Sequence, residues 1–178
     1  MKMYNFYFVV LLFIFSINFV LSCNFPNGTD TKLHFYNCDS NLPISITNVE
    51  IFDTDGNPMY PINPKKTMTV HLTGINNGTI YENVKIKANI YSFDMNECSW
   101  SEIPTFDLLN NVDGCKYIKQ CPLETGNLER KITIDMSSFG FVFGLLFGDG
   151  NTYQLEIQMF NNNQDKIGCA FSQFQFLS

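Results

Sequence analysis

Positive charge is scarce in this sequence. Its 178 residues contain 11 lysines and arginines against 17 aspartates and glutamates, which gives a formal net charge of −6. A chain with this balance has no basic surface to attract a phosphate backbone, so nucleic acid is excluded as a partner. The length is too short for two ordinary domains, and 45% hydrophobic side chains support one packed domain rather than a disordered chain.

The usual signatures of catalysis and metal binding are also missing. His34 and His71 are the only histidines and no G-x-S-x-G motif occurs, so no catalytic triad can be assembled. No C-x-x-C or H-x(3–5)-H pair occurs, which argues against a zinc site. The segment Asp53–Gly56 lacks the residue order and the glutamate of a calcium loop and is interpreted as a turn. We therefore expect no enzyme activity, no metal and no cofactor.

An apolar stretch at the N-terminus, Phe6 to Leu21, follows Lys2 and ends before Ser22. This pattern is typical of a secretory signal peptide over residues 1–22, with residues 23–178 as the single mature domain. A membrane anchor is the alternative, but the stretch is shorter than the ~20 residues that span a bilayer. A bacterial lipoprotein signal fits less well, because Leu21 is large for such a site. Six cysteines behind this signal favour disulfides and a secreted or endolysosomal location.

Two Asn-x-Thr sequences gain meaning if the chain is secreted. Asn27 and Asn77 each precede a glycine and a threonine, in surroundings rich in turn-forming residues. A glycan at either position would meet only water, so both are candidate glycosylation sites.

Alternation of apolar and polar residues dominates the remaining chain and predicts β-strands. The alternating runs are Ile44–Ile51, Met68–Leu72, Val84–Ile90, Ile132–Met136 and Tyr153–Met159. In the first run the phase slips at Thr47-Asn48, which predicts one bulged strand, with two short strands as the alternative. Turn sequences separate the runs, at Asp55–Pro58, Asn76–Gly78, Asp113-Gly114 and Asp149–Asn151. Several strands at this spacing predict a β-sandwich, with a closed barrel as the alternative.

One segment, Ser137–Gly148, is apolar on both strand phases. Four of its residues are phenylalanine, and a glycine recurs at every fourth position. A buried strand with bulges is one interpretation. The other is an apolar rim around a hydrophobic cavity, because contiguous exposed apolar surface marks a ligand groove or a membrane contact.

Cysteine motifs carry a family resemblance. Asp113-Gly114-Cys115-Lys116, followed by Cys121-Pro122-Leu123, resembles the central motif of the ML lipid-recognition family. Tyr36–Asp39 and the segment Tyr153–Phe160, which returns through Gly168–Phe171, are similar to the first and last strands of that family. The resemblance covers about residues 34 to 176. The chain departs from the family's sterol carriers because it lacks their small disulfide loop after the first cysteine.

The resemblance implies an all-β fold: an immunoglobulin-like sandwich of two antiparallel sheets with an internal apolar cavity. It also implies disulfides from Cys38 to Cys169 and from Cys115 to Cys121. Cys23 and Cys98 then remain as a third candidate pair, although six cysteines allow fifteen connectivities.

The implied function is that of a soluble, monomeric carrier. It would hold a phospholipid (phosphatidylglycerol or phosphatidylinositol) or a sterol between its sheets and transfer it between membranes through transient surface contact. The alternative is a secreted recognition or accessory protein that presents a surface or a bound lipid to a protein partner. The candidate lipid-binding residues are Val70, Leu72, Val84, Ile86, Phe106, Phe141, Phe143, Leu145, Phe147, Ile157, Met159 and Phe171.

Overall fold

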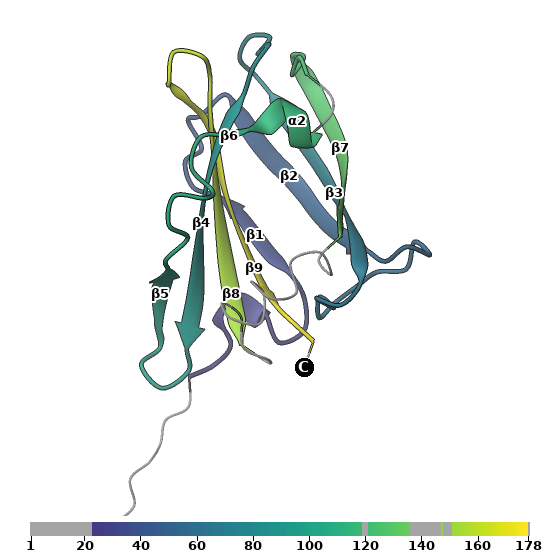
Figure 1. Ribbon diagram of the computed structural model, residues 1–178, viewed down its shortest axis with the longest axis vertical. Coiled ribbons are helices and arrows are strands. Elements are labelled where there is room, and N and C mark those ends of the chain that lie inside the picture. Colours follow the sequence, from purple (N-terminus) through teal and green to yellow (C-terminus); the bar gives the residue numbers. More distant parts are fainter. Residues whose placement is uncertain (1–22, 119–120, 136–146, 148–150, 178) are drawn as a thin grey trace, which may run out of the picture.

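The computed structural model describes residues 23–118, 121–135, 147 and 151–177 (Figure 1). The predicted signal peptide and the candidates Phe141, Phe143 and Leu145 lie outside the described residues. The strands are β1 (His34–Asn37), β2 (Ile44–Phe52), β3 (Thr67–Asn76), β4 (Lys85–Asp94), β5 (Ser99–Ile103), β6 (Val112–Asp113), β7 (Gly126–Asp135), β8 (Thr152–Phe160) and β9 (Lys166–Gln175). Two short helices, η1 (Pro26–Gly28) and α2 (Gly114–Ile118), complete the described elements.

The strands form two antiparallel layers. The hydrogen-bonded order is β5-β4-β8-β9-β2-β3-β7, with β1 beside β9 and β6 beside β4. The step from β9 to β2 is a single parallel pair, Ile44 with Gly168, so β5-β4-β8-β9 and β2-β3-β7 are separate layers joined along one side. Figure 1 shows these layers facing each other. The expected immunoglobulin-like sandwich is confirmed, and the barrel alternative is wrong because β5 and β7 end the strand order unpaired with each other.

The phase slip near Thr47 is a β-bulge. Ile46 pairs with Gly74 and Asn48 pairs with Thr73, so Thr47 is the extra residue within one continuous strand β2. A Cβ at Gly74 would lie 2.6 Å from the Ser45 carbonyl oxygen. The bulge therefore depends on glycine at the facing position of β3.

Two core clusters join the layers and fix which strand phases face inward. The first core cluster consists of Ile44, Val84, Leu123, Leu128, Met159 and Ile167. The second core cluster consists of Met59, Ile62, Met68, Tyr153 and Phe176. Each contains residues from both layers, so the phase of β3 that carries Met68 and the phase of β8 that carries Tyr153 and Met159 point into the sandwich.

The predicted turn at Asp113-Gly114 is instead the start of helix α2. The carboxylate oxygen Oδ1 of Asp113 accepts a hydrogen bond from the Lys116 backbone N–H at 3.3 Å. Aspartate at this position satisfies a donor that the first helical turn leaves open, so the sequence begins a helix where a turn was expected.

Three disulfides are present: Cys23–Cys98, Cys38–Cys169 and Cys115–Cys121. The second ties the residue after β1 to β9 across 131 positions, and the third closes a loop across 6 positions. Among the described residues, no helix is long and apolar enough to cross a membrane.

Candidate functional site

The candidate site is the middle of the sandwich, between the two core clusters. In the β2-β3-β7 layer, register places Val49, Leu72 and Arg130 in one inward row and Ile51, Val70 and Ile132 in the next. In the facing layer the inward rows are Ala88, Ile157 and Ala170, then Ile90, Leu155 and Ser172. We call these four rows the central rows.

Every side chain of the central rows is partly exposed, whereas the neighbouring rows at both ends contain buried residues such as Met68, Leu128, Tyr153 and Met159. Inward apolar side chains in a solid sandwich are normally buried, because burial of apolar surface drives the packing of the sheets. Solvent therefore reaches the apolar faces between the sheets. An apolar, solvent-accessible interior is suited to an apolar ligand.

Small residues widen this interior on one side. Ala88 and Ala170 flank Ile157, and Ser172 flanks Leu155, so the wall formed by β4, β8 and β9 carries large side chains only on some of its central positions. Facing positions on β2 and β3, such as Val49 and Leu72, are branched and apolar. Except for Ser172, the central positions of both layers other than Arg130 are therefore apolar, and the β4-β8-β9 wall carries smaller side chains than the facing wall.

Most described candidates from the sequence lie on the inward phases. Val84 and Met159 belong to the first core cluster, and Ile86 and Ile157 pack against it. Val70 and Phe147 pack against the second core cluster. Leu72 lies in a central row. The structure thus distributes these residues over two clusters and the space between them rather than gathering them at one point.

Two candidates do not face the interior. Phe171 pairs with Glu156 on the outer phase of its layer and stacks on Tyr36 with ring centroids 5.0 Å apart. The inward phase of β9 carries Ala170 and Ser172 instead, which an apolar-alternation argument overlooks. Phe106 lies in the β5–β6 loop with its side chain 84% exposed and a φ of +48°.

Arg130 is the inward residue that sequence reasoning missed. It follows Leu128 and precedes Ile132 and Ile134 on the same phase of β7, and its Nε atom is buried. Its Nη1 donates a hydrogen bond to the Glu129 carbonyl oxygen at 2.7 Å. The period-two series from Leu128 to Ile134 contained the signal, but the charge at its second position hid the strand's extent.

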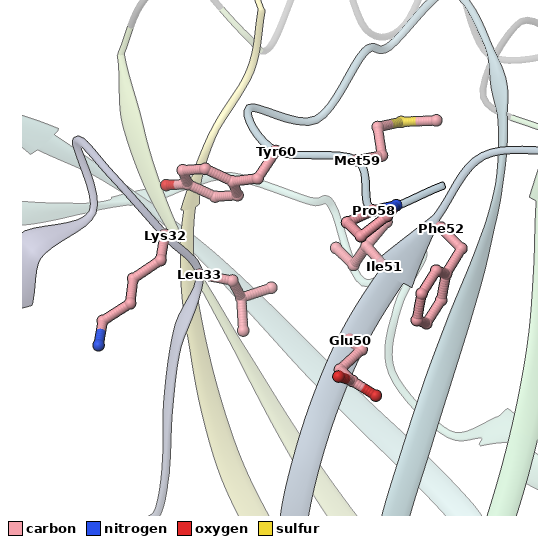
Figure 2. Close-up of a pocket in the computed structure, with 8 residues that line it drawn as sticks. All are labelled: Lys32, Leu33, Glu50, Ile51, Phe52, Pro58, Met59 and Tyr60. Carbon is pink, nitrogen blue, oxygen red and sulfur yellow. The ribbon is translucent and has the colours of Figure 1, made fainter. Parts of the chain in front are cut away.

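A small apolar pocket opens beside the interior (Figure 2). Leu33, Ile51, Phe52, Pro58, Met59 and Tyr60 line it, with Lys32 and Glu50 on opposite walls. Its volume is about 160 Å³. A cavity near this size holds a benzene-sized molecule, and ligand sites usually exceed about 300 Å³. The pocket reaches Ile51 of a central row from the side but is too small to hold a lipid chain.

A larger pocket of about 430 Å³ lies on the outer face near the first core cluster. Seven of its nine lining residues carry an amide or ammonium group: Lys85, Lys87, Asn110, Asn111, Asn161, Asn162 and Gln164, beside Ile86 and Phe160. Amide and ammonium groups would lose hydration against an acyl chain, so this surface is unsuited to the apolar part of a lipid.

A polar network covers the outer face of the β4-β8-β9 layer. Glu156 is 9% exposed and accepts hydrogen bonds from Asn89 Nδ2 at 2.9 Å and from the Tyr91 hydroxyl at 3.0 Å. Burial alone would raise the pKa of Glu156, but these donors, a third from Gln158 and the Lys166 charge outweigh it and lower the pKa below its ordinary value. The carboxylate is therefore held ionised inside a satisfied network.

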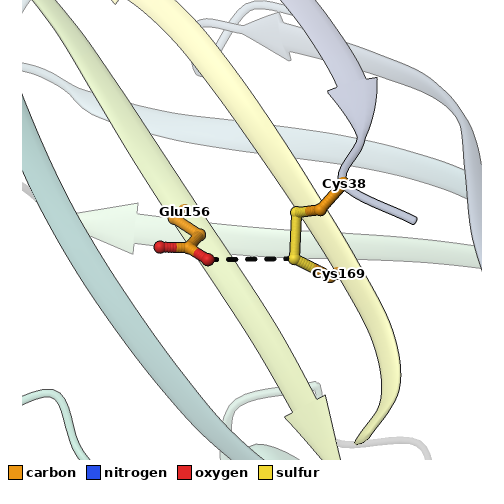
Figure 3. A group of neighbouring side chains, drawn as sticks. All are labelled: Cys38, Glu156 and Cys169. Carbon is orange, nitrogen blue, oxygen red and sulfur yellow. Dashed lines mark hydrogen bonds between the residues drawn. A yellow bond between two sulfur atoms is a disulfide. The ribbon is translucent and has the colours of Figure 1, made fainter. Parts of the chain in front are cut away.

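Glu156 also lies beside the Cys38–Cys169 disulfide (Figure 3). Its Oε1 is 3.9 Å from Cys169 Sγ. These three residues are close enough to resemble a metal cluster. Both sulfurs are consumed by the disulfide, however, and a metal needs the thiolate form, so the cluster has a structural role.

The N-terminal segment closes this outer face. Asn27 Nδ2 donates to Gln173 Oε1 at 2.7 Å, and Gln173 Nε2 donates to Gln154 Oε1 at 2.7 Å. The Tyr60 hydroxyl donates to the Thr29 carbonyl oxygen and accepts from the Gln175 backbone N–H. Burial raises the pKa of Tyr60 to about 12, against the effect of the Gln175 donor, and the nearby Asp30 charge raises it further.

Comparison with known proteins gives a match to one family model. The model of the ML domain matches residues 32–176. No curated protein shows significant sequence similarity to the chain. Among solved structures, a Niemann-Pick type C2 protein from the Japanese carpenter ant is 14% identical with a TM-score of 0.49, and the match covers 80% of this chain and 98% of that one. Chicken MD-1 complexed with lipid IVa is 12% identical with a TM-score of 0.34, covering 79% of this chain and 86% of that one.

Proposed function

This chain belongs to the ML domain family, and on that premise we propose that it is a soluble carrier that holds a phospholipid or a sterol between its two sheets and transfers it between membranes. The observation that carries the proposal is the partial exposure of every apolar side chain in the central rows. Family membership supports lipid binding, and the central rows supply a place for the apolar part of the lipid.

A carrier is needed because the free-energy cost of lipid desorption is large. Moving a chain of about 15 methylenes into water costs about 12 kcal/mol at about 0.8 kcal/mol per methylene. An apolar interior replaces bilayer by protein with a small net change in free energy. Transfer of this kind needs no covalent step, no cofactor and no energy source.

The exposed β5–β6 loop is a suitable membrane contact. Phe106 and Leu108 are 84% and 76% exposed, on either side of Asp107. Large apolar side chains on an exposed loop gain free energy when they enter the interfacial region of a bilayer. Replacement of both by serine should slow transfer between vesicles and leave the affinity for a soluble lipid probe unchanged.

Secretion and glycosylation are part of the same proposal. Three disulfides fit an oxidising compartment. A signal peptide over residues 1–22 would direct the chain to such a compartment. Asn27 and Asn77 are both exposed, but the Asn27 side-chain amide also donates a hydrogen bond to Gln173. A glycan on the Asn27 nitrogen would compete with that hydrogen bond, so glycosylation should be more complete at Asn77. Peptide mapping of protein secreted from a eukaryotic host, before and after glycosidase treatment, measures both occupancies.

The decisive experiment combines lipid extraction with transfer. The protein is purified from secreting cells, its bound lipids are extracted and identified by mass spectrometry, and the movement of that lipid between donor and acceptor vesicles is timed. We expect a co-purifying lipid at close to one molecule per protein and transfer that accelerates with protein concentration.

Each outcome has a separate meaning. Absence of any bound lipid together with absence of transfer would contradict the carrier function. Stable binding without transfer would instead support a protein that presents its lipid to a partner. Leu72→Asp places a charge in a central row and should abolish binding, whereas Thr133→Asp, on the exposed face of β7, serves as the matched control.

A further inference from the structure

We propose that the larger pocket, on the outer face, is a second binding site for a small hydroxylated ligand with one anionic group, a sugar phosphate or a sugar carboxylate. We call it the polar pocket. It lies over the start of β4, between the loop that precedes β6 and the β8–β9 hairpin. Binding there goes beyond the carrier function and does not depend on it, because the polar pocket is outside the space between the sheets.

Strand register gathers positive charge in the polar pocket. Lys85 and Lys87 are two residues apart on β4 and share its outer phase, whereas Ile86 between them packs against the first core cluster. Lys85 pairs with Phe160, so an ammonium group and an aromatic ring come together from neighbouring strands. Two cations in one pocket of a chain with a net charge of −6 mark a place that favours a negative group.

Neither ammonium group is neutralised within the part of the chain that the structure describes. No hydrogen bond or ion pair joins the side chain of Lys85 or Lys87 to another described residue, and no carboxylate is among the described lining residues. Two carboxylates of neighbouring strands are engaged elsewhere: Asp113 accepts from the Lys116 backbone N–H, and Glu156 accepts from two side chains of β4. Both lysines are partly buried, and they remain available to an anionic ligand.

The walls of the polar pocket are held in place by their own hydrogen bonds. In the β8–β9 hairpin, Asn161 Oδ1 accepts from the backbone N–H groups of Asn163 and Asp165, both at 2.9 Å. On the other side, the Ala88 backbone N–H donates to the Leu109 carbonyl oxygen at 3.0 Å, which ties the loop before β6 to β4. Walls that are fixed before binding lose little conformational entropy when a ligand enters.

Amide groups determine the neutral part of the ligand. The side chains of Asn111, Asn162 and Gln164 line the polar pocket and have no hydrogen-bond partner among the described residues. Each amide presents N–H donors and a carbonyl acceptor, which suits a hydroxyl group because a hydroxyl also donates and accepts. The Phe160 ring adds an apolar surface on which the C–H face of a sugar ring can pack. The volume of about 430 Å³ is that of a small-molecule site.

The test measures dissociation constants by calorimetry for four soluble probes: glucose 6-phosphate, glucuronate, glucose and inorganic phosphate. The protein is the mature, disulfide-bonded chain. At least one of the two sugar anions should bind about tenfold more tightly than glucose, which lacks the charge, and than inorganic phosphate, which lacks the hydroxylated ring. Stronger binding of glucose 6-phosphate identifies a phosphate as the anionic group, and stronger binding of glucuronate identifies a carboxylate.

Variants assign the binding to the polar pocket. Lys85→Met with Lys87→Met should reduce the affinity for the sugar anion to that for glucose, and Asn162→Ala should weaken the sugar anion and glucose alike. Lys65→Met, at an exposed position between β2 and β3, is the matched control and should leave every constant unchanged. Thermal melting checks that each variant is folded.

Three outcomes would overturn the proposal. The first is that neither sugar anion binds the wild type, and this arm needs no variant to fold. The second is equal affinity for glucose 6-phosphate and inorganic phosphate, which would mean that the amides do not recognise a sugar. The third is a sugar anion that binds the folded lysine double variant as tightly as the wild type, which would place the binding elsewhere on the protein.

Discussion

At the middle of strand β8, the two faces of the β4-β8-β9 layer differ in burial in the opposite sense to their polarity. On β8, the outward Gln154 and Glu156 are 7% and 9% exposed, whereas the inward Leu155 and Ile157 beside them are both partly exposed. Polar side chains are normally the more exposed ones, and apolar side chains the more buried. The two faces therefore differ in packing: the outer face is buried under other parts of the protein, and the central rows of the inner face are partly exposed.

Hydrogen bonding explains how the outer face tolerates burial. Gln154, Gln173 and Glu156 each have side-chain hydrogen-bond partners, and Asn27 and Tyr36 of the N-terminal segment are among them. Buried polar groups cost free energy only when they lack such partners. Among the described residues, the central rows of the inner face are partly exposed and have no comparable hydrogen-bonded cover. Stability and binding should therefore respond separately to substitutions on the two faces.

The largest expected loss of stability is that caused by removal of the Cys38–Cys169 disulfide, which links the residue after β1 to β9. Cys38→Ala with Cys169→Ala opens a loop across 131 positions, and Cys115→Ala with Cys121→Ala opens one across 6 positions. The chain-entropy relation gives losses of about 5 and about 2 kcal/mol in the free energy of unfolding. Urea unfolding of both double variants measures them. Equal losses would mean that native packing around each bond, rather than loop length, sets its contribution.

A smaller loss is expected from the polar network itself. Gln173→Leu removes the donor to Gln154 and the acceptor for Asn27 at a position that is 2% exposed. The free energy of unfolding should fall by about 1–3 kcal/mol because buried polar partners lose their hydrogen bonds. Lipid affinity should not change. Thr133→Leu, on the exposed face of β7, is the control and should alter stability by less than about 0.5 kcal/mol. A fall in lipid affinity without a fall in stability would reverse the assignment of the two faces.

The positions of the strands were predictable from the sequence. Which side chains of each strand point inward was predictable for some strands only. Alternation placed Ile157 and Met159 inward correctly, and the phase slip located the bulge at Thr47. On β9 the same reasoning placed Phe171 inward, although Cys169 and Phe171 share the outer phase. The inward residues there are Ala170 and Ser172, whose small size weakens the hydrophobic signal.

The candidate site was less predictable because it depends on the incomplete burial of the side chains in the central rows. Nothing in the sequence states that Leu155 is partly exposed while Tyr153 is fully buried, since this depends on how the layers separate. Arg130 was hidden for the opposite reason: a charge on an inward phase breaks the very alternation that identifies strands. Because both features are local exceptions to the strand pattern, pattern rules find the scaffold more readily than the candidate site.

A polar substitution on the inner face should lower lipid affinity more than stability, the reverse of the effect expected on the outer face. Leu155→Asn introduces an amide at a partly exposed central position, opposite Ser172 of β9. Affinity for a lipid probe should fall by about tenfold, since the amide must lose hydration against the chain. The loss of stability should be smaller than the 2–5 kcal/mol typical of a fully buried leucine. Titration of a fluorescent lipid and thermal melting measure the two effects. Unfolding of this variant with no folded protein to titrate would identify Leu155 as solid core.

The smallest effect is a dependence on pH that originates on the outer face. The pKa of Glu156 is lowered from its ordinary value of 4.5, so this carboxylate stabilises the folded protein above that pH, and the contribution is lost as the pH falls through the folded-state pKa. Glu156→Gln removes this contribution, so the gap in unfolding free energy between wild type and variant should narrow as the pH falls from 6 to 3. Asn89→Ala, which removes the leading donor, should weaken the same pH dependence by moving the pKa back toward its ordinary value. Lipid affinity, which the proposed function assigns to the inner face, should be the same in both variants as in the wild type at pH 6. A gap that stays constant with pH would mean that the hydrogen bonds to residue 156 matter only as packing, and that its charge contributes nothing to the burial of the outer face.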